Sequence, residues 1–169
     1  FANFVENLGL KPEAATQRLH ELRVAIFGLE GHGAHLALEP AQLGVGRCLL
    51  ADPFLTAESD ALLMPAAAFH PGLSRQENVA KAIESLAPST TVTLMEDLSR
   101  DSVREIAADA SLLVGCFDRG YETAHHWINR AAIATGIPAI FAEISTHIAR
   151  LGPCVLPGQA ACYMCYRMR

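Results

Sequence analysis

Short apolar runs alternate along the chain with longer segments that carry helical periodicity or helix-start and helix-stop signals. The apolar runs have the length of buried strands. They occupy residues 23–27, 47–52, 90–95, 111–116 and 137–141. The helical segments occupy residues 11–22, 32–44, 74–86, 101–110 and 120–135. Strands that alternate with helices are typical of a mostly parallel sheet covered on both faces, so we predict a single α/β domain over residues 1–169.

Several segments depart from this regular alternation. Pro40 is expected to kink the helix over residues 32–44, or to lie where a lost hydrogen bond is tolerated. The proline-containing stretch 53–72 is longer than most connections, which favours a functional or mobile loop. A last strand is expected over residues 146–155, followed by a loop that carries two cysteines.

Composition narrows the class of protein. Apolar residues make up 51% of the chain and charged residues 18%, which excludes a disordered protein. No apolar stretch approaches the roughly 18–20 residues of a membrane helix, and no secretory signal is visible. The net charge of −5 argues against nucleic-acid binding, because phosphate neutralisation requires clustered positive charge. Lys11 and Lys81 are the only lysines among the 13 basic residues.

The cysteines predict both a compartment and a metal site. Five cysteines without regular spacing are poor material for a disulfide framework, so a reducing cytoplasm is expected. Cys162 and Cys165 have the spacing with which two thiolates reach one Zn²⁺. A redox dithiol and a metal-free pair are the alternatives, but redox motifs prefer to open a helix, so half of a structural zinc site is favoured. Cys154, eight residues before Cys162, is an alternative third ligand, but it is expected to be a buried strand thiol like Cys48 and Cys116.

A glycine-rich turn follows the strand over residues 23–27. Gly28, Gly31 and Gly33 stand between this strand and a helix, a context in which backbone N–H groups bind phosphate. Asp52 ends the next strand, where a carboxylate can bind ribose hydroxyls. Glu30 stands where a further glycine is usual and brings a negative charge to the turn. The alternatives are nucleotide binding and a purely structural role in the tight turn and close helix packing.

Two aromatic features of the helix over residues 120–135 have simpler interpretations. His125 and His126 are adjacent, and neighbouring helix residues point about 100° apart, so they are not expected to share a metal. One is expected to be partly buried and the other exposed. Trp127, Ile128 and Ala131 share a face that is more typical of a core than of a cofactor site.

The order of these pieces resembles the ThiF/MoeB family of ubiquitin-activating-enzyme-like adenylyltransferases. The segments that carry the resemblance are RVAIFGLEGHG, LGVGRCLLAD, GLSRQENVAKAIESLAPSTTVT, SLLVGCFDRGYETAHHWINRAAIATGIPAIFAEI and LGPCVLPGQAACYMC. The resemblance implies a Rossmann-like fold followed by a Cys-x-x-Cys zinc loop, with ATP and Mg²⁺ used to adenylate the C-terminal carboxylate of a small protein or peptide. It assigns the phosphate loop to Gly28, Gly31 and Gly33, the ribose contact to Asp52 and the Mg²⁺ contact to Asp118.

Other positions depart from the family pattern. Phe54 stands where a second Asp is expected, and Asp60, Leu63 and Met64 align with the family's Asn-x-x-Arg-Gln. The catalytic lysine has no counterpart near Gly72, and Arg75 is the closest cation. Losing such cationic groups removes most transition-state stabilisation, so the resemblance implies a domain that no longer adenylates. If it is active, Asp118 and Arg75 are the expected catalytic residues.

Within the family, the chain resembles most the non-adenylating ThiF-like proteins of thiazole/oxazole-modified (bacteriocin) peptide biosynthesis. The resemblance implies a homodimeric scaffold that binds the leader of a precursor peptide and delivers it to a YcaO-type cyclodehydratase. A peptide-binding module before position 1 and a second cysteine pair after position 169 are then expected, which would make the sequence a fragment. The alternatives are an active adenylyltransferase, acting on the C-terminus of a peptide or of a ubiquitin-like or sulfur-carrier protein, and an NAD(P)-dependent oxidoreductase.

Overall fold

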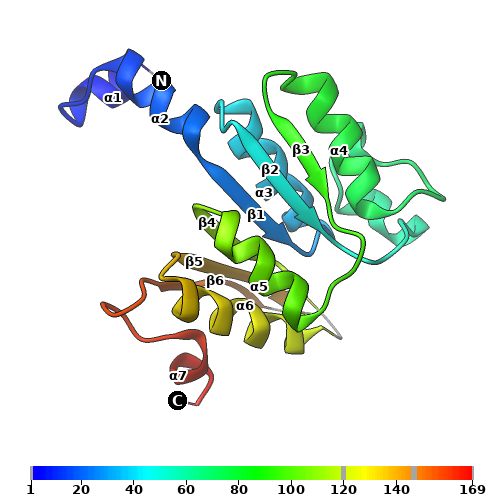
Figure 1. Cartoon of the computed structure of the whole chain (residues 1–169). Coiled ribbons are helices and arrows are strands. Elements are labelled where there is room, and N and C mark those ends of the chain that lie inside the picture. The colour runs from blue at the N-terminus through cyan, green and yellow to red at the C-terminus, as the bar shows by residue number, and fades with distance from the viewer. Residues whose placement is uncertain (1, 119–120, 146–147, 169) are drawn as a thin grey trace.

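The computed structural model describes residues 2–118, 121–145 and 148–168. Its centre is a six-stranded sheet with the order β3-β2-β1-β4-β5-β6 (Figure 1). The strands are β1 (Arg23–Phe27), β2 (Arg47–Ala51), β3 (Thr91–Leu94), β4 (Leu112–Gly115), β5 (Ala139–Ser145) and β6 (Ile148–Val155). Strands β1 to β5 pair in parallel, and β6 runs antiparallel to β5. The predicted mostly parallel α/β sheet is confirmed.

Helices cover both faces of the sheet, as Figure 1 shows. They are α3 (His32–Gln42) and α4 (Arg75–Leu86) on one face, and α5 (Arg100–Asp109) and α6 (Glu122–Thr135) on the other. Because successive strand residues point to opposite faces, Ile26 joins the apolar cluster under α3 and α4, and Phe27 joins the cluster under α5 and α6. The near-continuous apolar runs in the sequence reflect this burial on both faces.

The connections contain elements that the pattern did not predict. A short helix α1 (Ala2–Asn7) precedes α2 (Pro12–Glu21), and both lie at the N-terminal end of the molecule, beyond the sheet (Figure 1). The stretch after β2 contains two 3-10 turns, η1 (Glu58–Leu62) and η2 (Ala66–Ala68). Pro40 lies inside α3, in its last turn.

No helix among the described residues is long and apolar enough to cross a membrane.

Two predictions about the C-terminal part are wrong. Cys162 and Cys165 do not lie in a loop, because Cys162 caps and Cys165 belongs to the short helix α7 (Tyr163–Arg167). Burial of Tyr163 in the core under α5 and α6 holds this turn in place. Cys154 is exposed, since β6 is an edge strand in which half of the residues are exposed and Val155 alone is buried. Cys48 and Cys116 are buried, as predicted.

The helix α6 also differs in detail from its prediction. Ile128 and Ala131 are buried in the core, but Trp127 is half-buried at the edge of the packed region. His125 is fully buried and His126 is half-buried rather than exposed. The helix therefore turns a narrower face toward the sheet than the sequence indicated, and Trp127 lies at the boundary of that face.

Candidate functional site

The glycine turn after β1 is shaped by close backbone approaches. Gly28 has φ +86°, and a Cβ there would lie 2.8 Å from the backbone of Cys116. At Gly33 a Cβ would lie 2.0 Å from the Gly28 carbonyl oxygen. Gly31 has φ +46°, and its Cβ would lie 2.9 Å from the Cβ of Leu63. Each glycine therefore has a packing reason within the chain, so the structural interpretation accounts for all three without a nucleotide.

Asp52 fastens this turn to the segment that follows β2. The residue is 1% exposed. Its Oδ2 accepts from the Leu29 N–H at 2.7 Å, and its Oδ1 accepts from the Phe54 N–H at 2.9 Å. Burial raises the pKa of this carboxyl above its usual range, although both backbone hydrogen bonds work in the opposite direction. Both oxygens thus have partners inside the protein, and binding of a ribose would compete with them.

The space beside Asp52 is small. A cavity lined in part by Asp52, Gln76 and Met95 has a volume of about 10 Å³, which is the room for about one water molecule. Gln76 closes it from one side, because its Oε1 accepts from the Asp52 N–H and its Nε2 donates to the Met95 carbonyl oxygen. A sugar ring does not fit into this cavity.

Arg75 lies among three carboxylates. Its Nε and Nη2 donate to the two oxygens of Asp60 at 2.9 and 3.0 Å. Nη1 lies 3.8 Å from Asp52 and 3.9 Å from Glu30. Burial works to raise the pKa of Asp60, but the Arg75 guanidinium outweighs it and holds that pKa below its usual range. Sequence reasoning missed this bidentate pair, because the two residues are 15 positions apart and Asp60 lies in an unpredicted 3-10 turn.

Asp118 is held by two other groups. Its Oδ1 accepts from the Ile144 N–H, and its Oδ2 lies 3.4 Å from His32 Nδ1. Burial would lower the pKa of His32, but the Asp118 carboxylate and the Ala142 carbonyl outweigh it, so the pKa is raised. Mg²⁺ prefers oxygen ligands, and at Asp118 an ion would have to compete with the Ile144 N–H at one carboxylate oxygen and with His32 at the other. The described residues contain no group of three or more metal-ligating side chains.

The cysteine pair has a geometry that suits zinc. The two sulfur atoms of Cys162 and Cys165 lie 3.6 Å apart, close to the separation of two thiolates on one tetrahedral Zn²⁺ with Zn–S bonds of about 2.3 Å. Hydrogen bonds from the backbone of Cys165 lower the pKa of Cys162. Since the motif opens a helix after all, the argument that favoured zinc over a redox dithiol fails. The zinc prediction now depends on the sulfur separation and the family resemblance.

A buried histidine connects α7 to the Asp118 turn. His125 Nε2 accepts from the Phe117 N–H, so Nδ1 carries the proton and donates to the Tyr163 hydroxyl oxygen at 3.2 Å. Tyr163 N–H in turn donates to Asn129 Oδ1. Burial lowers the pKa of His125 to about 4. His125 and Asn129 are four residues apart on α6, a spacing that could have revealed a shared buried face.

The structure thus brings most of the predicted site residues together at the carboxyl ends of the strands, near the point between β1 and β4 where the strand order reverses. We call this place the crevice. The turn itself contains Gly28, Gly31 and Gly33. Asp52 is hydrogen-bonded to it, Arg75 lies beside Asp52, and His32 connects it to Asp118. A glycine turn after β1 and an acidic residue after β2, in a mostly parallel sheet with helices on both faces, are typical of a Rossmann-like α/β domain. Among the described residues, hydrogen bonds through Tyr163 and His125 connect the helix of the cysteine pair to the turn that carries Asp118.

Comparison with known proteins identifies the family. The profile of the ThiF family matches residues 4–169, so the chain belongs to the ThiF family. Among solved structures it is similar to the E. coli MccB structure with succinimide, at 21% identity and a TM-score of 0.83 over 95% of this chain and 48% of that one. It is also similar to the microcin C7 biosynthetic enzyme MccB in complex with N-formylated MccA, at 20% identity and a TM-score of 0.85 over 98% of this chain and 48% of that one.

A third similar structure is that of PaaA, at 22% identity and a TM-score of 0.78 over 95% of this chain and 49% of that one. The chain thus spans about half the length of these proteins. At these identities the likeness shows the fold alone. No curated protein sequence matches the chain.

Proposed function

We propose that this chain is a non-adenylating ThiF-type scaffold that binds a precursor peptide and presents it to a YcaO-type cyclodehydratase in azoline-containing peptide biosynthesis. The observation that carries the non-adenylating part is the crevice, where Arg75 is already paired with Asp60 and flanked by Asp52 and Glu30. Peptide recognition is supported by the similarity to MccB, whose structure has been solved in complex with MccA.

Electrostatics argue against ATP in this crevice. Three carboxylates surround a single guanidinium, so the local charge is negative where a triphosphate would need cations. Families that stabilise phosphoryl charge do so with free cationic groups, each contributing several kcal/mol to the transition state. Arg75 is bound bidentately to a carboxylate and is not free for that role.

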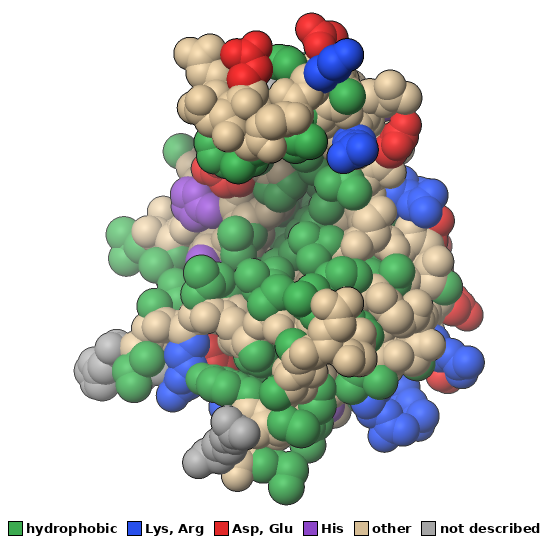
Figure 2. Space-filling view, turned by 90° about the vertical axis from the view of Figure 1, so that its left-hand side faces the viewer, with side chains coloured by type: hydrophobic (Ala, Val, Ile, Leu, Met, Phe, Trp, Pro, Cys, Tyr) green, Lys and Arg blue, Asp and Glu red, His purple; other side chains and the backbone are tan. Residues whose placement is uncertain are grey.

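A homodimer and a structural zinc ion belong to the same proposal. Hydrophobic side chains gather over the middle of the face below α1 and α2 (Figure 2). The chain exposes large apolar side chains on α1 and on β5–β6, among them Phe4 (66% exposed) and Leu151 (81% exposed). Contiguous exposed apolar surface is typical of protein interfaces. Zn²⁺ would take Cys162 and Cys165 as two of its ligands.

An active adenylyltransferase is the second candidate, and one observation favours it. Arg75, Asp52 and Asp118 surround the glycine turn, and MccB has been solved with ATP. In that case Arg75 and Asp118 would be catalytic and would have to leave Asp60 and His32. The oxidoreductase alternative is not supported, because the chain belongs to the ThiF family and its sixth strand is antiparallel.

Calorimetric titration of the full-length protein with ATP and Mg²⁺, joined to a pyrophosphate-exchange assay, separates the candidates. The scaffold predicts no heat of binding and no exchange with any peptide, and it predicts copurification of the cyclodehydratase with the precursor. Micromolar ATP binding, with exchange that disappears in Asp118→Ala, would overturn it in favour of the adenylyltransferase.

A further inference from the structure

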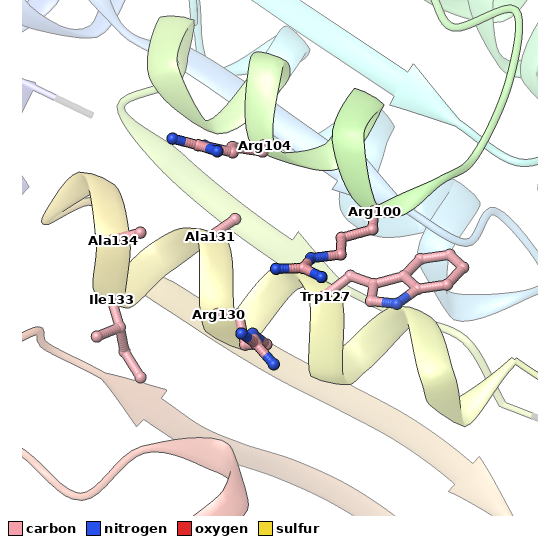
Figure 3. A pocket seen from close by; sticks show the side chains of 7 residues that line it. All are labelled: Arg100, Arg104, Trp127, Arg130, Ala131, Ile133 and Ala134. Atoms are coloured by element: carbon pink, nitrogen blue, oxygen red, sulfur yellow. The ribbon is translucent and has the colours of Figure 1, made fainter.

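A groove between α5 and α6 carries three arginines, on the face of the sheet opposite the glycine turn. Its volume is about 330 Å³. Arg100 and Arg104 line it from successive turns of α5, and Arg130 and Trp127 line it from α6 (Figure 3). The floor is apolar, with Ala131 buried beneath the charged rim.

The three guanidinium groups lack internal partners. Within the described part of the chain, no side-chain hydrogen bond or ion pair involves Arg100, Arg104 or Arg130. Like charges one turn apart on a helix repel each other, and Arg100 also stands in the first turn of α5, where the helix dipole disfavours a cation. The three exposed guanidinium groups are therefore available to an external anionic partner.

We propose that this groove is a docking site for an acidic peptide segment with apolar residues between its carboxylates. Arginine is suited to this partner, because its planar fork binds a carboxylate bidentately. Trp127 and Ala131 offer apolar contact between the charged groups. Because the groove lies on the other face of the sheet from Asp52, the inference does not depend on the proposed function.

The arrangement of the arginines favours a peptide over a single small anion. In Figure 3 the side chain of Arg100 reaches from α5 toward Trp127, whereas that of Arg104 extends along α5 away from it. The charged ends are therefore spread along the groove and do not converge on one point, as they would around a phosphate. Asp101 and Glu105 flank Arg104 on α5 but do not line the groove. The positive charge is therefore confined to the groove and does not extend over the surrounding surface, as an anionic lipid surface or a nucleic acid would require.

The test is a titration of the full chain with a fluorescently labelled synthetic peptide, rich in glutamate with spaced leucines. A peptide of the same sequence with glutamine in place of glutamate is the control probe. Saturable anisotropy change is expected for the acidic peptide alone, and it should weaken as salt is added. Trp127, the only tryptophan of this sequence, should change its fluorescence over the same concentration range.

Charge reversal at the groove gives the decisive comparison. The variant R100E/R104E should lose affinity at least about tenfold. The matched variant R18E/K81E, which makes the same change of charge at exposed positions outside the groove, should stay within about twofold. Thermal unfolding followed by circular dichroism should show that both variants fold.

Four results of the peptide titrations would overturn the proposal. They are an absence of saturable binding, equal binding of the glutamine peptide, equal losses in the two charge-reversed variants, and displacement of the peptide by inorganic phosphate at matching affinity. Arginine-dependent binding to phosphatidylserine vesicles that exceeds binding to the peptide would assign the groove to a membrane surface and would also overturn it.

Discussion

The two sides of the sheet use the same residue type in opposite ways. In the crevice Arg75 is bound bidentately to Asp60 and lies within 4 Å of Asp52 and Glu30. In the groove between α5 and α6, Arg100 and its two arginine neighbours line an open space without internal partners among the described residues. The presence of a charged side chain therefore does not by itself predict a binding site. The deciding feature is whether the side chain is already paired with an opposite charge inside the protein.

This contrast indicates that the crevice residues contribute to stability and that the groove residues contribute to binding. Groups that satisfy each other inside the crevice stabilise the turn after β1 and the segment after β2, and they oppose the entry of an anion. Groups left unsatisfied in the groove contribute little to folding and are available to a partner. Substitutions should therefore change stability on the first side and binding on the second, and the following predictions test that division from the largest effect to the smallest.

Removal of Arg75 should have the largest effect. Arg75→Ala leaves the carboxylate of Asp60, 1% exposed as a residue, without its cation, which should lower the free energy of unfolding by about 3 to 5 kcal/mol. Urea unfolding measures it. The double variant Arg75→Ala/Asp60→Ala should be less destabilised than the sum of the two single variants. Strict additivity would show that the pair does not interact.

Acid should weaken the molecule through His125. The pKa of His125 is lowered from 6.5 to about 4 in the folded protein, so the unfolded state takes up the proton first as the pH falls. The stability it contributes is complete above pH about 6.5 and is lost as the pH falls toward about 4, by about 3 kcal/mol in all.

Unfolding of the wild type and of His125→Gln across this range isolates the effect. The difference in unfolding free energy between the two proteins should depend on pH, because the wild type alone contains His125. The contribution of His32, whose pKa is raised, has the opposite sign but is the same in both proteins and cancels. A constant difference between pH 4 and 6.5 would show that the His125 imidazole is not held neutral.

Asp52 should have an intermediate effect. Asp52→Ala leaves the buried N–H of Leu29 and the N–H of Phe54 without acceptors, which should cost about 2 kcal/mol. Asp52→Asn keeps one acceptor and should cost less. The exposed Asp97→Ala serves as the control, with an expected change within about 0.5 kcal/mol. Equal unfolding energies for the Asp52 and Asp97 variants would contradict the role given to the carboxylate.

The groove should give the smallest effect on stability. Arg130→Ala removes an exposed side chain with no internal partner in the described chain, so the free energy of unfolding should change by less than about 0.5 kcal/mol. Thermal and urea unfolding of this variant provide the measurement. A loss similar to that of Arg75→Ala would mean that the groove arginines are structural, and the contrast between the two regions would collapse.

The fold could be predicted from the sequence because a strand that is buried on both faces needs apolar residues at successive positions, which are visible as short apolar runs. Strands β1, β2 and β4 and helix α4 match their predicted segments within a residue or two. The glycine turn and Asp52 were found because their chemistry depends on local spacing after a strand, and the family resemblance led to Asp118.

The contacts that decide function lie beyond local spacing. The Arg75–Asp60 pair joins a helix to an irregular segment, and the His32–Asp118 contact spans 86 positions. The groove arginines could not be found either, because sequence periodicity placed Trp127 in the core, and only the packing of α5 against α6 shows that it borders a groove. Residues far apart in sequence meet through tertiary packing, which periodicity does not encode.

The mutual satisfaction of Arg75 and Asp60 also has an evolutionary consequence. Loss of either residue alone leaves the charge of the other buried without a partner, which destabilises the folded protein. In an alignment of homologues the two positions should therefore vary together or not at all. The groove arginines carry no such internal constraint. Their variation should instead follow the acidic sequence of whatever partner each homologue binds, so that covariation within the chain would mark the crevice and covariation between chains would mark the groove.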